Sequence, residues 1–196
     1  MITQEIYDTC LFLARCVYFD VDYPEPFNKI ITIKESSGLK MNIFKFDDYA
    51  IVVFAGTNQK RDWISNVGIG LGIIPKQLEQ ALSYTRLYVG FKTPLFVCGQ
   101  SLGGAIAQYV GSQCQCSCIT FNSCGCKHLI RNINANFECI NIITEHDILN
   151  NIQLKLPGKK WMKHCGQMYF VTDNCDKPCA ESHSDFSSMT KFKVKI

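Results

Sequence analysis

The sequence predicts an α/β fold in which helices cover a mostly parallel β-sheet. Residues 49–55 form a continuous run of apolar and β-branched residues, which is typical of a central strand buried on both faces. Strand-like and helix-like segments alternate around this run, and such alternation favours a parallel sheet. A glycine-rich turn at residues 99–104 joins a strand-like segment directly to a helix-like one. The length of 196 residues suits a single compact domain, residues 1–196.

The spacing of apolar residues predicts each element in turn. Apolar side chains at steps of three and four over residues 2–18 predict an amphipathic helix. Strands are predicted over residues 29–34, 41–46, 49–55, 95–98, 118–121, 137–144 and 161–171, and further helices over residues 75–88 and 102–111. Lys191–Ile196 alternates between lysine and apolar residues, which predicts a last strand with one lysine face. We interpret that face as protection of an edge strand from aggregation, with a contact to anionic lipid as the alternative.

The composition excludes several classes of protein. Hydrophobic residues make up 47% of the chain, so it is globular rather than disordered. A net charge of +3 is too small to indicate nucleic-acid binding. No apolar run reaches the roughly 20 residues of a transmembrane segment, and the first basic residue is Arg15, so no secretory leader is predicted. We therefore expect a cytoplasmic protein that can touch membranes peripherally, with host-directed action or export by another route as the alternative.

The cysteines predict neither a disulfide scaffold nor a metal site. Twelve cysteines fall below the density of small disulfide-built domains, and several lie in predicted strands or helices, where a thiol packs as a small hydrophobic group. We expect reduced thiols. The pairs Cys114/Cys116 and Cys124/Cys126 leave one residue between possible ligands, whereas structural zinc sites commonly leave two to four. A metal-binding interaction module built on these cysteines is a minor alternative.

The G-x-S-x-G motif lies at residues 99–103, between a predicted strand and a predicted helix. This is the context of a hydrolase nucleophile elbow, in which a serine on a sharp turn lies beside the first N–H groups of the helix. The motif predicts Ser101 as the nucleophile and the N–H of Leu102 as one donor to the oxyanion. A glycine-rich turn with a bystander serine is the alternative.

A serine nucleophile needs a histidine that takes its proton and a carboxylate that orients the histidine. In elbow hydrolases both follow the serine along the chain, the acid first. Asp147 follows a predicted strand, at the sheet edge where α/β sites are built, although a helix N-cap is another role for it. Of the later histidines we favour His183, because it lies in a predicted loop, over His164, which lies in a predicted strand.

A second oxyanion donor is expected in a loop after another central strand. Thr57 follows the strand at residues 49–55 after one glycine, and it offers both an N–H and a hydroxyl. An ordinary strand-end turn is the alternative. The next segment contains Trp63 and Ile64 and is strongly apolar, so it either meets an acyl groove or a membrane interface or simply covers the core.

These motifs resemble the class 3 lipase family, the fungal triacylglycerol-lipase type of α/β-hydrolase. VFAGT at residues 53–57, with RDWI at residues 61–64, resembles the oxyanion strand and the start of the lid. GQSLGGA at residues 99–105 resembles the GHSLGGA elbow, with glutamine in place of the usual histidine. Residues 143–149 resemble the segment that carries the acid, and residues 162–166 resemble a non-catalytic His-x-Gly stretch, which further favours His183.

One departure from the family lies after the strand at residues 118–121, where the chain reads Asn122-Ser123-Cys124 in place of the usual Gly-x-Pro. The resemblance implies an α/β-hydrolase-type single domain that hydrolyses lipid carboxylic esters at a membrane or lipid–water interface without metal or cofactor. The implied site residues are Ser101, Asp147 and His183 as the triad, Thr57 and Leu102 as the oxyanion hole, and Trp63 and Ile64 at the lid. A neutral lipase and a phospholipase A1 both fit, and a non-catalytic member that binds lipid or a partner is the alternative.

Overall fold

The computed structural model describes residues 1–23, 27, 29–56, 75–89, 93–130, 137–149, 163–172, 184 and 186–194. Its strands are β1 (Lys29–Lys34), β2 (Lys40–Lys45), β3 (Ala50–Phe54), β4 (Leu95–Gln100), β5 (Ser117–Phe121), β6 (Cys139–Thr144) and β7 (Gln167–Val171). Within the described residues these strands form one seven-stranded sheet, in the same order as along the chain. The first three strands pair antiparallel, and β3 to β7 pair parallel, which confirms the predicted mostly parallel sheet.

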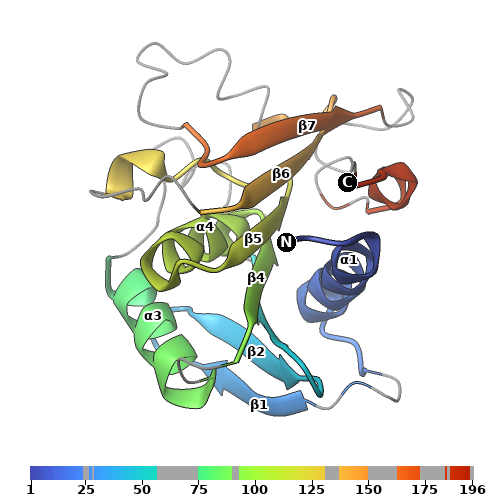
Figure 1. Ribbon diagram of the computed structural model, residues 1–196. Coiled ribbons are helices and arrows are strands. Elements are labelled where there is room, and N and C mark those ends of the chain that lie inside the picture. Colours follow the sequence, from blue (N-terminus) through green and yellow to red (C-terminus); the bar gives the residue numbers. More distant parts are fainter. Residues whose placement is uncertain are drawn as a thin grey trace.

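Helices cover both faces of the sheet, giving a three-layer α/β/α arrangement (Figure 1). The helical segments are α1 (Gln4–Phe19), α3 (Pro75–Val89), α4 (Leu102–Cys114) and the short 3-10 helices η1 (Lys127–Leu129) and η3 (Ser188–Lys191). α3 and α4 share one hydrophobic core with the sheet, and α1 and η3 share the other. No helix in the described part of the chain is both long and apolar enough to cross a bilayer.

β3 has the doubly buried character that its sequence predicts. All five residues are buried, and successive side chains alternate between the two cores. Val52 and Phe54 lie in the core beneath α3 and α4, whereas Ile51 and Val53 lie in the core beneath α1. A strand with apolar neighbours on both faces needs no polar side, which explains its continuous apolar run.

α1 packs on the face of the sheet opposite α3 and α4, and it runs toward the edge where the parallel strands end. The helix begins after Thr3, whose hydroxyl accepts the N–H of Ile6 (3.3 Å), as an N-cap does. Beyond its last turn, the Asp20 carboxylate forms an ion pair with Lys40 (2.6 Å). The Lys40 carbonyl accepts the N–H of Ala55 (2.9 Å), so the end of α1 lies beside the end of β3.

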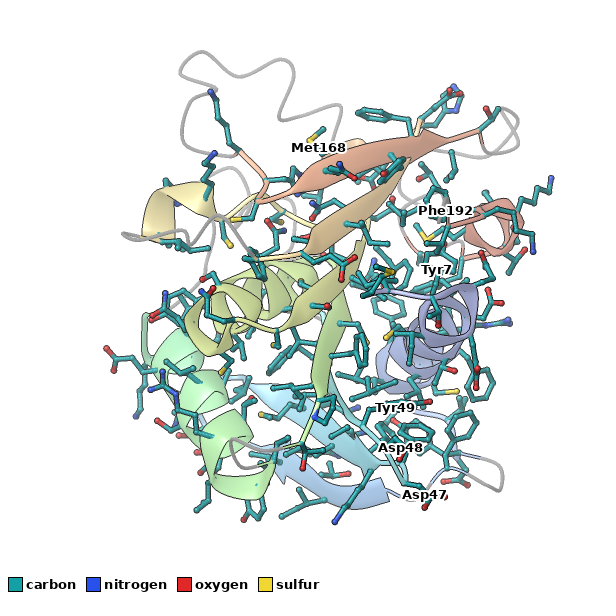
Figure 2. All side chains as sticks on the ribbon, viewed as in Figure 1. Tyr7, Asp47, Asp48, Tyr49, Met168 and Phe192 are labelled. Atoms are coloured by element: carbon teal, nitrogen blue, oxygen red, sulfur yellow. The ribbon has the colours of Figure 1, made fainter. Side chains whose placement is uncertain are left out.

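The predicted strand at Lys191–Ile196 is wrong for the residues of that segment that the structure describes. Its first residue ends η3, and residues 192–194 have no regular structure. The ring of Phe192 packs against Tyr7 of α1, with 5.1 Å between centroids (Figure 2). The Phe192 carbonyl also accepts a hydrogen bond from Gln4 (3.3 Å). Contacts with α1 therefore take the place of strand pairing. The alternation of lysine and apolar residues carries no signal for such long-range contacts.

Candidate active site

The candidate active site begins at the turn between β4 and α4. Ser101 has φ 57° and ψ −124°, a backbone conformation that residues other than glycine rarely adopt, and α4 begins at the next residue. The N–H of Ser101 donates to the carbonyl of Phe121 (3.1 Å), and its carbonyl accepts the N–H of Ala105 (3.3 Å). A strained serine between a strand and a helix is the geometry of a nucleophile elbow, as the motif predicts.

Close backbone packing explains the glycines on either side of the serine. A Cβ on Gly103 would lie 2.1 Å from the carbonyl oxygen of Phe54. A Cβ on Gly99 would lie 2.5 Å from the carbonyl oxygen of Gly103. Both contacts are with backbone atoms, which cannot rotate away as a side chain can. Glycine at these two positions therefore allows α4 to lie directly against the ends of β3 and β4.

The end of β3 lies next to Ser101. A Cβ on Gly56 would lie 3.1 Å from the Cβ of Ser101 and 2.9 Å from the carbonyl oxygen of Gln100. The loop that the sequence assigns to the oxyanion hole therefore starts beside the elbow. Leu102 is the first residue of α4, so its N–H has no acceptor within the helix. Three residues of the predicted oxyanion hole and lid lie outside the described residues: Thr57, Trp63 and Ile64.

Asp147 lies at the same edge of the sheet. Phe121 at the end of β5 is opposite Ile142 in β6, so the two strands end side by side. The chain then turns, and the carbonyl of Thr144 accepts the N–H of Asp147 (3.0 Å). Only 1% of Asp147 is exposed, which is characteristic of a carboxylate held by specific partners. Residues 148 and 149 are helical, so an N-cap role also fits its position.

His164 lies in a turn before β7 and not within a strand, because β7 begins at Gln167. Its Nδ1 lies 3.3 Å from Nε2 of Gln108 and 3.3 Å from Oδ1 of Asn141. Burial lowers the pKa of this histidine to about 4, although the nearby Asp147 carboxylate opposes the shift. His164 is therefore neutral at pH 7.

The proton of His164 is assigned from its neighbours. Oε1 of Gln108 accepts the N–H of Cys165 (2.9 Å), which fixes the orientation of the amide. The two amide hydrogens of Gln108 are then used by Ser123 Oγ (2.9 Å) and the Cys124 carbonyl (3.1 Å). Nδ1 of His164 therefore donates to Asn141. Because a triad histidine uses that N–H to contact its acid, His164 is committed elsewhere.

His183 itself lies outside the described residues, but Ser184 and Phe186, which follow it, are described. The side chain of Ser184 is hydrogen-bonded to Tyr18, near the end of α1 that lies beside the end of β3. The ring of Phe186 packs against Phe121, the last residue of β5, with 6.3 Å between centroids. The chain just after His183 therefore runs along the same edge of the sheet as Ser101.

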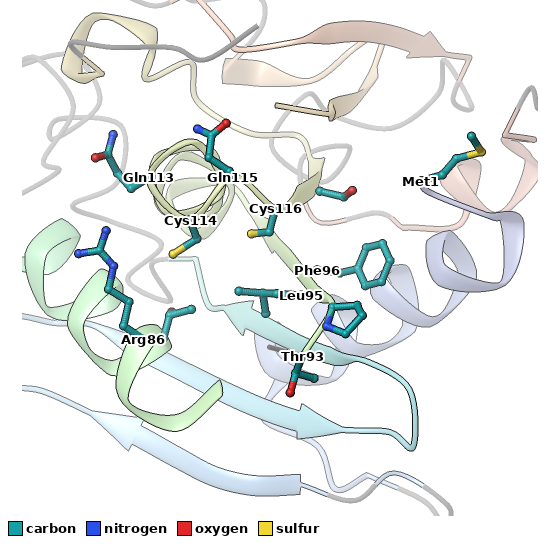
Figure 3. Close-up of a pocket in the computed structure, with 12 residues that line it drawn as sticks. Met1, Arg86, Thr93, Leu95, Phe96, Gln113, Cys114, Gln115 and Cys116 are labelled. Atoms are coloured by element: carbon teal, nitrogen blue, oxygen red, sulfur yellow. The ribbon is translucent and has the colours of Figure 1, made fainter. Parts of the chain in front are cut away.

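A cavity of about 580 Å³ lies at the opposite edge, where β4 and β5 begin (Figure 3). Leu95, Cys116 and Ser117 are among the residues that line it. Because Ser101 lies at the other end of β4, this cavity does not contribute to the candidate active site. Within the described part of the chain, no three histidine, cysteine or acidic side chains are grouped so as to hold a metal ion, and ten cysteines are free thiols.

A mostly parallel sheet with a strained serine between β4 and α4 defines a fold of the α/β-hydrolase type. The triacylglyceride lipase of Rhizomucor miehei superposes with a TM-score of 0.59 at 17% identity, over 88% of this chain and 82% of that one. Lipase II of Rhizopus niveus superposes with a TM-score of 0.58 at 14% identity, over 85% and 80%. At these identities the likeness shows the fold.

The chain belongs to the Tle-like phospholipase domain family, whose model matches residues 24–141, more than half of its length. The extracellular phospholipase A1 of Serratia liquefaciens is 34% identical over 90 residues. That match covers 45% of this chain and 28% of the relative, so the chain spans under a third of that protein's length. The resemblance to lipases on which the site prediction rests is therefore confirmed at the level of family and fold.

The expectation of a cytoplasmic protein is wrong. The Serratia relative is an extracellular phospholipase, and this finding points away from the cytoplasm. The expectation rested on the lack of a leader-like pattern before Arg15, and such a pattern does not decide where a protein acts.

Proposed function

We propose that this chain is a serine hydrolase that cleaves carboxylic esters of lipids. The observation that carries the proposal is the backbone of Ser101, which is held at φ 57° between β4 and α4. Strain of this kind costs roughly 1–3 kcal/mol and is commonly retained where it serves a function. The family match and the Serratia relative support a lipid ester as the substrate.

In the proposed reaction, Ser101 attacks the acyl carbonyl and His183 accepts its proton. Asp147 orients His183 and stabilises the imidazolium, and His183 then protonates the leaving alcohol. Water hydrolyses the acyl-enzyme by the same route. The positions of Ser184 and Phe186 at the catalytic edge support His183 as the base. The low pKa of His164 and its hydrogen bond to Asn141 argue against His164 as the base.

The tetrahedral intermediate carries its negative charge on the former carbonyl oxygen. We assign its stabilisation to the N–H of Leu102 and to Thr57, which follows Gly56 directly. The short approach between Gly56 and Ser101 supports this assignment. Removal of one oxyanion donor typically lowers kcat by about 10²–10³. Trp63 and Ile64 are assigned to the apolar surface that receives the acyl chain.

A fluorophosphonate probe tests the proposal, because it labels only an activated serine. We expect the wild-type chain to label, and Ser101→Ala and His183→Ala to lose labelling while they remain folded. His164→Gln is the matched control and should still label. Because only 1% of Ser101 is exposed, phospholipid vesicles that bind the protein should increase the labelling rate. A folded wild-type chain that does not label with or without vesicles would support the non-catalytic alternative.

Within lipid esters, the Serratia relative favours a phospholipid over a neutral glyceride. Release of fatty acid from the sn-1 position of phosphatidylcholine vesicles, compared with triacylglycerol emulsions at equal surface area, distinguishes the two. Faster hydrolysis of the emulsion would assign the chain to the neutral lipases.

A further inference from the structure

The turn after β5 has an unusual residue at its first position. Asn122 is fully buried and has φ 43°, in the left-handed region that ordinary side chains avoid. Asparagine tolerates this conformation better than most non-glycine residues. By the sequence resemblance to class 3 lipases, glycine is usual at this position, whereas this chain has an asparagine side chain here. In this chain the turn therefore gains an amide group at the centre of the candidate site.

On one side, this turn holds the backbone of the nucleophile. The carbonyl of Phe121 accepts the N–H of Ser101 (3.1 Å), and the N–H of Cys124 donates to the carbonyl of Ser101 (3.4 Å). A chain that continued straight beyond Phe121 would not present both groups to one residue. The left-handed backbone of Asn122 makes the chain turn so that both reach the elbow.

On the other side, the same residue holds the end of β6. Oδ1 of Asn122 accepts the N–H of Thr144 (2.8 Å) and contacts the Thr144 hydroxyl (3.2 Å). The carbonyl of Thr144 in turn accepts the N–H of Asp147 (3.0 Å). Thr144 is fully buried, so water does not compete for these bonds. One amide oxygen thus connects the turn beside the nucleophile to the turn that carries the acid.

We propose that Asn122 is a positioning residue that sets the separation between Ser101 and Asp147, and through Asp147 the orientation of the base. This inference rests on the proposed triad. Glycine would allow the backbone conformation without the link to Thr144, and most other residues would resist the conformation. Asparagine provides both, and its N–H additionally donates to the carbonyl of Ile142 (2.8 Å).

Asn122→Gly tests the proposal, because it keeps the backbone conformation accessible and removes only the amide. Active sites are titrated with a fluorophosphonate, and kcat, KM and the pH profile are then measured per titrated site. We expect kcat to fall by up to about a hundredfold, the loss that misplacement by about 1 Å can produce, with little change in KM. We also expect the acid limb of the kcat/KM profile to move to lower pH, because a displaced Asp147 stabilises the imidazolium less.

Asn42→Ala is the matched control, since Asn42 is a buried asparagine in β2, away from the elbow and the acid turn. It should lower the unfolding midpoint but leave kcat per titrated site and the acid limb unchanged. If Asn122→Gly fails to fold, Thr144→Val removes the hydroxyl contact to Asn122 but keeps the N–H bond, so it should shift kcat and the acid limb in the same direction by a smaller amount, with Thr144→Ser restoring both.

Three outcomes decide between the proposals. Folded Asn122→Gly or Thr144→Val with wild-type kcat and an unmoved acid limb would overturn the positioning role and leave the proposed function intact. Loss of stability without change in either kinetic readout would mean that Asn122 is only structural, which also overturns it. A folded wild-type chain that cannot be labelled at all would overturn the proposed function and this inference with it.

Discussion

At the scale of single residues, the site depends on backbone conformations that few residue types adopt. Ser101 and Asn122 both have positive φ, and the N–H of each donates to a carbonyl of the neighbouring strand. The cost of the strained backbone at Ser101 is therefore offset by hydrogen bonds to the surrounding fold, and the residue keeps its unfavourable φ. A substitution at Ser101 that removes the strain should stabilise the protein even though it removes the proposed nucleophile.

Ser101→Gly is expected to be more stable than Ser101→Ala, although neither variant can label. Glycine adopts φ 57° without a Cβ penalty, whereas alanine retains the penalty, so a difference of about 1 kcal/mol or more is expected. Urea unfolding of both variants measures it. At Ser112 within α4, the same pair should differ by about 1 kcal/mol in the opposite direction, because glycine is a poor helix former. Equal stabilities at position 101 would contradict a strained elbow.

At the scale of elements, the junction of α4 with β3 and β4 decides whether the elbow forms. α4 begins one residue after Ser101, and its first turn lies against the carbonyl of Phe54. A Cβ on Gly103 would lie 2.1 Å from the Phe54 carbonyl oxygen, so only glycine allows this contact. The helix therefore cannot shift along the sheet without displacing Ser101.

Gly103→Ala should therefore both destabilise the fold and slow labelling of Ser101. Overpacking of this kind typically costs about 1–3 kcal/mol. Gly111→Ala on the same helix is the control, since its Cβ would meet the ring of Phe137 at 2.6 Å, and a ring can move where a backbone carbonyl cannot. We expect a smaller loss of stability and normal labelling for Gly111→Ala. If the two variants label equally fast, the close approach at Gly103 does not matter for the site.

Regular elements could be predicted from the sequence, because their signals are local. The spacing of apolar residues in α1 and the unbroken apolar run of β3 each reflect the core beneath them. The last segment was predicted wrongly because its structure depends on Tyr7, almost the whole chain away. The elbow at Ser101 follows from its motif, whereas the link from Asn122 to Thr144 depends on strand register and cannot be found from spacing alone.

At the scale of the whole molecule, one sheet and two cores connect the described elements. We propose that residues 1–196 form a single domain, since both cores pack against the same strands. The polar network around His164 belongs to this scale, because it joins Gln108 of α4, Asn141 of β6 and the turn before β7. Protonation of His164 should consequently weaken the entire fold.

The free energy of unfolding should decrease as the pH falls from about 6.5 toward 4. The unfolded chain binds a proton at His164 near the ordinary pKa of 6.5, whereas burial lowers the pKa in the folded chain to about 4. The stabilisation from neutral His164 is complete above pH 6.5 and is lost as the pH falls from 6.5 to 4. The loss is at most about 1.4 kcal/mol per pH unit for one proton. Urea unfolding at several pH values measures it. His164→Gln should show a shallower pH dependence, and an identical slope would exclude His164 as its source.

The strand order of the sheet has a consequence for when the proposed activity could first arise. Because each strand pairs with its neighbour in the chain, the sheet can grow from β1 to β7 as the polypeptide is synthesised. In such a sequence the turn at Ser101 after β4 forms before the turn at Asp147 after β6, and the proposed base His183 is added to the chain after both. If the proposed triad is correct, a chain synthesised only as far as β4 carries the proposed nucleophile Ser101 without the proposed base His183, and we expect it to be inert toward lipid esters until His183 has been added.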